Sequence, residues 1–140
     1  MIVLVVRHAR AGKRADWIGD DRLRPLDERG RLQANRLVEQ LSDREFLRIL
    51  SSPYARCVET VEPLAEARGL TVEQDEALAE GSGASTALGA LRAIGEPVVA
   101  CVHGDLLAEL VGGKTPKGST TVLELEDDSV MVLERLEPPA

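Results

Sequence analysis

Two short apolar runs, IVLVV at 2–6 and PVVACV at 97–102, constrain the fold more than any other feature of this sequence. Neither run alternates with polar residues, which is typical of strands that are covered on both faces. Both are far shorter than the roughly 20 residues of a membrane-spanning helix. We therefore expect two inner strands of a sheet that has helices on each side.

Strand and helix patterns alternate along the rest of the chain. Asp27 is a good N-cap residue, and Ser52-Pro53 combines a capping side chain with a proline suited to a first helical turn. In chain order, we expect a helix from Asp27 to about Leu41, a strand at 47–52, a helix from Ser52-Pro53 to Gly69, an edge strand at 70–74, a helix at 85–94, the strand at 97–102, a helix at 105–111 and a hairpin that turns at Asp127-Asp128.

This order predicts an α/β fold with a mostly parallel sheet, helices on both faces and an antiparallel hairpin at the C-terminus. The chain has 140 residues, of which 44% are hydrophobic, and this suits a single domain spanning 1–140. No repeat or linker-like segment divides the chain.

The charge pattern bears on the partners. The formal net charge of −7 argues against nucleic acid, and no run is long enough to suggest a membrane. The segment from Arg7 to Arg31 is nevertheless basic, with eight Lys and Arg residues against five Asp and Glu residues. It either guides an anionic ligand to one end of the molecule or is a solvated loop of mixed charge. The oligomeric state is left open by the sequence.

The two cysteines, Cys57 and Cys101, fall in an expected helix and an expected strand. We interpret both as reduced packing residues. Because no signal-peptide pattern precedes the first strand, we expect a cytoplasmic protein.

Both histidines of the chain follow an expected inner strand. Arg7-His8 comes directly after the first run, and His103 comes directly after the second. In parallel sheets, ligands bind beyond the carboxyl ends of the strands. Arg56, near the start of the helix after the second strand, belongs to the same edge. We therefore expect these four side chains to converge.

Two arginines and two histidines suit a phosphoryl group. Each guanidinium can hold two phosphate oxygens, and the positive charges oppose protonation of a nearby imidazole, which then stays nucleophilic. A single histidine at a strand end, or a single helix arginine, is more often structural. The repeated order of strand, histidine and small residue (Ala9, Gly104) favours function, because a small residue lets a substrate approach the backbone.

Four segments resemble the histidine phosphatase superfamily, also called the phosphoglycerate mutase-like fold, over nearly the whole chain. They are LVVRHARAG (4–12), LSSPYARCVETVEPLA (50–65), DEALAEGSG (75–83) and VACVHGD (99–105). The stretch DRLRPLDERG (21–30) is similar to the small bacterial phosphohistidine-phosphatase branch. The chain departs from the family at Ala9, where many members have glycine, and we expect the added methyl group to narrow the pocket slightly.

The resemblance implies a mechanism residue by residue. It makes His8 the nucleophile that becomes phosphohistidine, from which water later releases phosphate. It makes Arg7, Arg56 and His103 the phosphate pocket, and Glu80 the proton donor to the leaving oxygen. The resemblance implies neither a metal nor another cofactor.

Glu80 depends most on its surroundings. An exposed glutamate is ionised at neutral pH and is a poor acid, so this role requires burial or the charge of the substrate. Asp75 and Glu76 are close by in the sequence and are easily mistaken for it.

Several functions are compatible with these motifs. We favour a phosphatase that hydrolyses phosphate monoesters or phosphohistidine, acting on a phosphorylated small molecule or a phosphoprotein, because little of the chain remains to form the lid of a mutase. One alternative is a nucleotide phosphatase, since similar compact domains occur fused to Nudix hydrolases. The others are a phosphoglycerate mutase-type phosphotransferase and a non-catalytic phosphate-binding regulatory domain.

Two groups of residues have no assigned role. Lys13, Arg14, Arg22 and Arg24 contact either substrate or only solvent. The stretch GGKT (112–115) resembles the end of a P-loop, but it lacks the earlier glycine and follows a helix, so we interpret it as a turn.

Overall fold

Six strands form one sheet in the computed structural model, which describes residues 1–140. The strands are β1 (Ile2–Arg7), β2 (Arg48–Ser51), β3 (Val72–Gln74), β4 (Val98–Val102), β5 (Thr120–Leu125) and β6 (Val130–Leu136). They lie in the order β3-β2-β4-β1-β5-β6. Strands β3, β2, β4 and β1 are parallel to one another. Strand β5 runs antiparallel to β1 and pairs with β6 as the C-terminal hairpin. The predicted α/β fold is confirmed.

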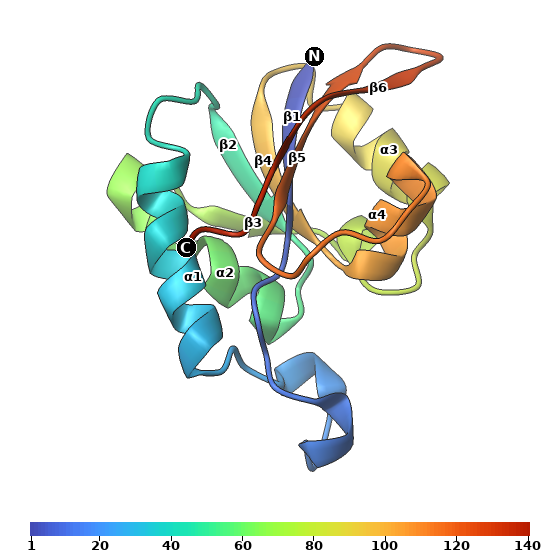
Figure 1. Ribbon diagram of the computed structural model, residues 1–140. Coiled ribbons are helices and arrows are strands. Elements are labelled where there is room, and N and C mark those ends of the chain that lie inside the picture. Colours follow the sequence, from blue (N-terminus) through green and yellow to red (C-terminus); the bar gives the residue numbers. More distant parts are fainter.

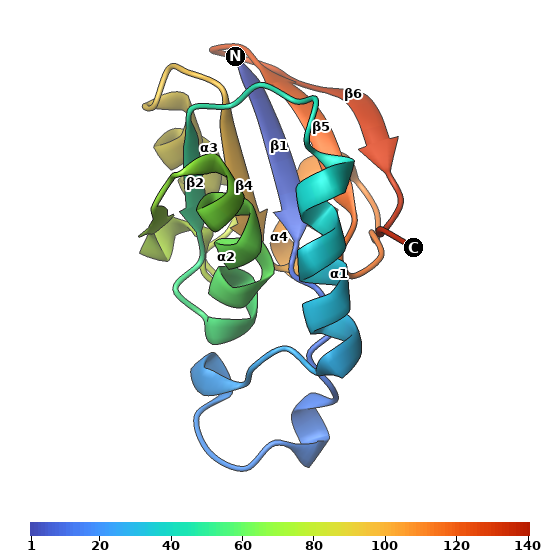
Figure 2. The same ribbon diagram turned by 90° about the vertical axis from the view of Figure 1, so that its left-hand side faces the viewer.

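Helices cover both faces of the sheet. α1 (Glu28–Gln40) and α2 (Ala55–Arg68) lie on one face, and α3 (Ala84–Arg92) and α4 (Gly104–Val111) lie on the other (Figures 1 and 2). The side chains of β1 alternate between the two resulting cores, with Val3 and Val5 in one and Leu4 and Val6 in the other. All four are buried, which explains why this strand has no polar position.

The cap of α1 and the end of α2 agree with the sequence. The Asp27 carboxylate accepts a hydrogen bond from the backbone N–H of Gly30 at 2.7 Å, which caps α1. Gly69 ends α2 in the left-handed conformation, with φ of 65°.

The predicted start of α2 at Ser52-Pro53 is wrong. The helix begins at Ala55, and its N-cap residue, Tyr54, makes no capping bond with its side chain. Ser52 directly follows β2 and extends its pairing with β4, because its N–H donates to the carbonyl of Cys101. Its hydroxyl oxygen accepts the N–H of Tyr54, as the side chain of an N-cap residue would, but the regular helix does not begin until Ala55.

The connection from β1 to α1 projects beyond the carboxyl ends of the strands (Figure 2). It contains two short 3-10 turns, Arg14–Asp16 and Asp21–Leu23. A small buried cluster joins this connection to α1 and consists of Ala9, Ala11, Leu26 and Ala34. None of the helices combines the length and apolar character needed to span a membrane.

Candidate active site

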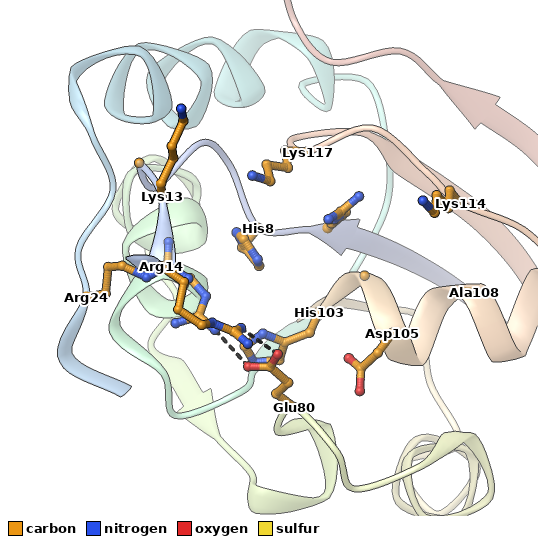
Figure 3. A pocket seen from close by; sticks show the side chains of 14 residues that line it. His8, Lys13, Arg14, Arg24, Glu80, His103, Asp105, Ala108, Lys114 and Lys117 are labelled. Atoms are coloured by element: carbon orange, nitrogen blue, oxygen red, sulfur yellow. Dashed lines mark hydrogen bonds and ion pairs between the residues drawn. The ribbon is translucent and has the colours of Figure 1, made fainter. Parts of the chain in front are cut away.

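A cavity of about 650 Å³ lies where β1 and β4 end (Figure 3). It is lined by Arg7, His8, Gly12, Lys13, Arg14, Arg24, Arg56, Glu80, His103, Gly104, Asp105, Ala108, Lys114 and Lys117. All five residues that the sequence singled out for the site are in this set. The structure therefore brings them together, although they are spread over almost 100 positions of the chain.

His8 follows β1 and is held firmly. Its backbone N–H donates to the carbonyl of Val102 at the end of β4, at 3.1 Å. Its side chain is 6% exposed, and Nδ1 lies 2.8 Å from the carbonyl oxygen of Ala9. A carbonyl can only accept, so Nδ1 carries the proton and Nε2 keeps its lone pair.

The surroundings of His8 keep its imidazole neutral. The pKa of His8 is lowered from 6.5 to about 3, mainly by burial; His103, Arg56 and Arg7 add to the shift, and the Ala9 carbonyl opposes it. The rings of His8 and His103 are 5.5 Å apart. A neutral imidazole beside fixed cations can act as a nucleophile toward an anionic group.

Arg56 is fully buried near the start of α2. Its Nη1 donates to the carbonyl of Asp21 at 2.9 Å, and its Nη2 donates to the carboxylates of Asp21 at 3.1 Å and Glu80 at 2.9 Å. The guanidinium also lies 4.9 Å from the centre of the Tyr54 ring. These contacts hold the Arg56 guanidinium in one orientation.

Arg7 lies against the start of α4. Its Nη1 donates to the carbonyl of Thr115. A Cβ atom at Gly104 would lie 2.7 Å from Cζ of Arg7, so only glycine leaves room for the guanidinium here. Gly104 lines the cavity, but the space that its missing side chain leaves is taken by Arg7. Burial lowers the pKa of Arg7, while Asp105 opposes this effect.

Three buried nitrogens around the cavity have no hydrogen-bond partner in the protein: Nε of Arg7, Nε of Arg56 and Nδ1 of His103. A buried polar atom without a partner is costly, and such atoms in native structures call for an explanation. The two guanidinium N–H groups, together with His103 in the tautomer that protonates Nδ1, suit the oxygens of an anionic ligand.

Ala9 does not narrow the cavity, contrary to the expectation from the sequence. It is fully buried and is not among the lining residues. Its N–H donates to the hydroxyl of Thr60 at 2.9 Å, and its side chain packs in the cluster with Ala11 and Leu26. The methyl group therefore faces the interior under the β1–α1 connection.

Two carboxylates line the cavity. Glu80 accepts from Arg14 at 2.6 Å with Oε1 and from Arg56 at 2.9 Å with Oε2. Asp105, which the sequence analysis did not single out, accepts from the N–H of Gly81 at 3.0 Å. Its place two residues after His103, in the motif VACVHGD, is the sequence feature that could have identified it as a residue of the site.

The neighbours Asp75 and Glu76 lie outside the cavity. The Asp75 carboxylate caps the short 3-10 turn at Glu76–Leu78. Glu76 forms an exposed ion pair with Arg22. Of these three carboxylates, only Glu80 lines the cavity.

The loop cations divide into two groups. Lys13, Arg14 and Arg24 line the cavity, whereas Arg22 does not. In Figure 3, cationic side chains surround His8, with Glu80 and Asp105 on one side.

The GGKT stretch is part of the connection between α4 and β5, in which the turn itself lies at 117–118, and it contributes to the site. Lys114 lines the cavity and the Thr115 carbonyl holds Arg7, while the nearby Lys117 is a further lining residue. No local pattern in the sequence marked these contributions, because they depend on how the α4–β5 connection folds back over β1. No group of three or more His, Cys, Asp or Glu side chains is placed to hold a metal ion.

Comparison with known proteins gives a family and a fold. Residues 3–89 match the histidine phosphatase superfamily (branch 1). The chain is 35% identical to an 8-oxo-(d)GTP phosphatase of Mycolicibacterium smegmatis, over 98% of this chain and 48% of that protein. The chain thus spans about half the length of this relative.

Solved structures share the fold across the whole chain. The protein histidine phosphatase SixA, complexed with tungstate, superposes with a TM-score of 0.82 at 23% identity, covering 99% of this chain and 97% of SixA. A mycobacterial glucosyl-3-phosphoglycerate phosphatase, complexed with VO3, gives a TM-score of 0.77 at 18% identity and 99% coverage of both chains.

Proposed function

The chain belongs to branch 1 of the histidine phosphatase superfamily, and from this premise we propose that it is a phosphatase that works through a phosphohistidine on His8. The observation that carries the proposal is the neutral His8 ring, with Nδ1 bonded to the Ala9 carbonyl and Nε2 left as the nucleophile. Its substrates are phosphorylated small molecules or phosphoproteins. We also propose that it acts in the cytoplasm, which its two free, buried cysteines support.

The first step transfers the phosphoryl group to the protein. The Nε2 lone pair attacks phosphorus, forming the N–P bond while the bond from phosphorus to the leaving oxygen breaks. The unpartnered N–H groups of Arg7, Arg56 and His103 stabilise the charge on the non-bridging oxygens. Glu80 is a carboxylate in its ion pairs with Arg14 and Arg56, so it first takes up a proton from solvent when Arg14 turns to the substrate, and then gives that proton to the leaving oxygen.

The second step releases phosphate. A water molecule attacks phosphorus, the N–P bond breaks, and its electron pair returns to Nε2 of His8. The Glu80 carboxylate accepts the proton from the water and is ready for another cycle. The net reaction consumes one water and yields an alcohol, or an imidazole when the substrate is a phosphohistidine, together with phosphate.

A steady-state comparison tests this function. We expect wild type to hydrolyse an aryl phosphate in the presence of a metal chelator, and His8→Ala to lose at least about 10³-fold in kcat, as for other nucleophile deletions. Circular dichroism would check that the variant is folded. If wild type is inactive on this substrate and on panels of phosphoproteins and nucleotides, the chain is instead a non-catalytic phosphate-binding domain.

A second candidate function is hydrolysis of nucleotide phosphates. The cavity has seven cationic side chains (Arg7, Lys13, Arg14, Arg24, Arg56, Lys114 and Lys117) against two carboxylates (Glu80 and Asp105). Burial, together with Arg7, Arg24 and Arg10, lowers the pKa of Lys117, so positive charge is in excess there. A di- or triphosphate carries more negative charge than one phosphate dianion and therefore offsets more of this excess. The similarity to an 8-oxo-(d)GTP phosphatase supports the same reading.

A substrate series distinguishes the two candidates. A nucleotide enzyme would have a higher kcat/KM for nucleoside di- and triphosphates than for a phosphohistidine peptide. Lys114→Gln and Lys117→Gln would reduce that preference, whereas Arg36→Gln, an exposed position outside the cavity, would not. Equal kcat/KM values across the series would contradict the nucleotide function and favour hydrolysis of monoesters or phosphohistidine.

A further inference from the structure

Ser52 contacts the second histidine of the site. Its Oγ lies 2.8 Å from Nε2 of His103, and both residues are buried. The same oxygen accepts the backbone N–H of Tyr54 at 3.3 Å. That bond uses a lone pair of the oxygen and leaves the hydroxyl hydrogen free to donate. Nε2 of His103 is the strongest acceptor that this hydroxyl contacts.

This contact has a consequence for the other ring nitrogen of His103. In a neutral imidazole one nitrogen accepts and the other carries the proton. If Nε2 accepts from Ser52, the proton is on Nδ1. Nδ1 is the buried nitrogen that has no partner in the protein, and His103 lines the cavity beside His8. The proton is thus on the nitrogen that is free to donate to a ligand.

Cys57 is the other side chain at Nε2, with Sγ at 3.5 Å. A thiol is a weaker donor than a hydroxyl, and this distance is longer. The hydrogen bond from Ser52 is therefore the stronger of the two at Nε2. The competing arrangement is a Cys57 thiolate with a His103 imidazolium, in which both ring nitrogens carry protons.

We propose that Ser52 is a positioning residue that fixes the His103 tautomer, so that Nδ1–H is directed to the phosphoryl group. The role in turnover rests on the proposed phosphatase function, but the tautomer itself does not. Ser52 does not line the cavity, so it acts through His103 and not by direct contact with the substrate. An adjacent buried serine provides a matched control, because the Ser51 hydroxyl donates to the Ser52 carbonyl and makes no contact with His103.

The tautomer can be read directly by NMR, because the chain has two histidines. In protein labelled with ¹⁵N-histidine, two-bond ¹H–¹⁵N correlations identify the protonated nitrogen of each ring, and His8→Ala assigns the remaining signals to His103. We expect a protonated Nδ1 and a bare Nε2 in wild type and in Ser51→Ala. Ser52→Ala is expected to shift His103 to a mixture of tautomers. A bare Nδ1 in wild type, or protons on both nitrogens, would overturn the proposal.

Kinetics test whether the tautomer matters for turnover. We expect Ser52→Ala to lower kcat for an aryl phosphate about tenfold, the effect of losing one hydrogen bond, with a smaller change in KM. Ser52→Thr keeps the hydroxyl and should restore the Nδ1–H tautomer and most of kcat. Ser51→Ala should retain the wild-type kcat. If Ser52→Ala matches wild type in both tautomer and kcat, the proposal fails, while a His8→Ala variant that stays active would overturn the phosphatase mechanism instead.

Discussion

The His8 side chain is buried but has a single hydrogen-bond partner in the protein, the carbonyl oxygen of Ala9. Protonating its second nitrogen would place a charge in a buried site beside Arg7, Arg56 and His103. The fold therefore keeps this imidazole neutral well below the pH at which a free histidine gains its proton. The neutral state that suits His8 to the proposed nucleophilic role also destabilises the folded protein in acid.

That cost predicts how stability depends on pH. The folded pKa of His8, about 3, lies below the unfolded value of 6.5, so the unfolded state binds more protons over that interval. The free energy of unfolding should therefore fall as the pH drops from 6.5 toward 3, by up to about 1.4 kcal/mol per pH unit from this group. Urea unfolding of wild type and His8→Gln at pH 7 and pH 5 measures the effect. Wild type should lose about 2 kcal/mol more than the variant, and equal losses would contradict the assignment.

Substrates with different leaving groups show whether Glu80 or Asp105 is the proton donor. A poor leaving group, such as an alkyl alcohol, needs a proton in the transition state, whereas a nitrophenol does not. We expect Glu80→Gln to lower kcat for an alkyl phosphate about 10²-fold or more, and for an aryl phosphate much less. Asp105→Asn should affect both substrates alike. The reverse pattern would make Asp105 the proton donor.

The sequence reveals some of these residue contacts and not others. Arg7, His8 and His103 can be placed together because each stands at the end of an inner strand, and the ends of parallel strands meet at one edge. What fills the space at Gly104, or under Ala9, depends on side chains that come from distant elements. A pattern of small residues does not say whether the neighbour is a substrate or an arginine.

At the scale of elements, the position of the site depends on how α1 meets the β1–α1 connection. A Cβ atom at Gly30, in the first turn of α1, would lie 1.8 Å from the carbonyl oxygen of Arg10. That carbonyl also accepts the N–H of Asp27, so the two segments are joined at their closest approach. This contact holds the connection that carries Lys13, Arg14 and Arg24.

Gly30→Ala should therefore be strongly destabilising. We expect the free energy of unfolding to fall by about 2 kcal/mol or more, because backbone must move to make room. Gly89→Ala is the matched control, since Gly89 lies in α3 and has no atom within 4 Å of the added Cβ. That variant should be unchanged or more stable by about 0.5–1 kcal/mol. Similar unfolding curves for the two variants would contradict the packing described here.

Most elements could be predicted from apolar periodicity and capping residues, including α1 behind Asp27 and the end of α2 at Gly69. The start of α2 could not. Ser52-Pro53 has the composition of a helix start, and the Ser52 hydroxyl accepts the N–H of Tyr54, but the regular helix begins only at Ala55. Local preference therefore places this boundary only to within about two residues.

At the scale of the whole molecule, the net charge and the site have opposite signs. The chain has a formal charge of −7, whereas the cavity is lined mainly by cations. An acidic surface repels anions in general, and the basic cavity attracts them to one place. The sequence suggested this from the basic segment at 7–31, but the further contributions of Lys114 and Lys117 arise only from the fold.

This arrangement predicts a salt dependence. If several cavity cations attract the substrate, kcat/KM should fall as ionic strength rises, and more steeply for a nucleoside triphosphate than for a monophosphate. Lys114→Gln and Lys117→Gln should flatten the slope for the triphosphate, while Arg36→Gln should leave it unchanged. Identical slopes for the two substrates in wild type would show that these cations do not act on distal phosphates.

The covalent intermediate is the central claim, and rapid-quench trapping tests it most directly. Wild type mixed with a ³²P-labelled aryl phosphate and quenched within one turnover should yield a phosphoprotein that is labile in acid and stable in alkali, with the label on the peptide that contains His8. His8→Ala should give no such species. A wild type that turns over substrate rapidly without any trapped phosphoprotein, or that carries the label on another residue, would contradict the account.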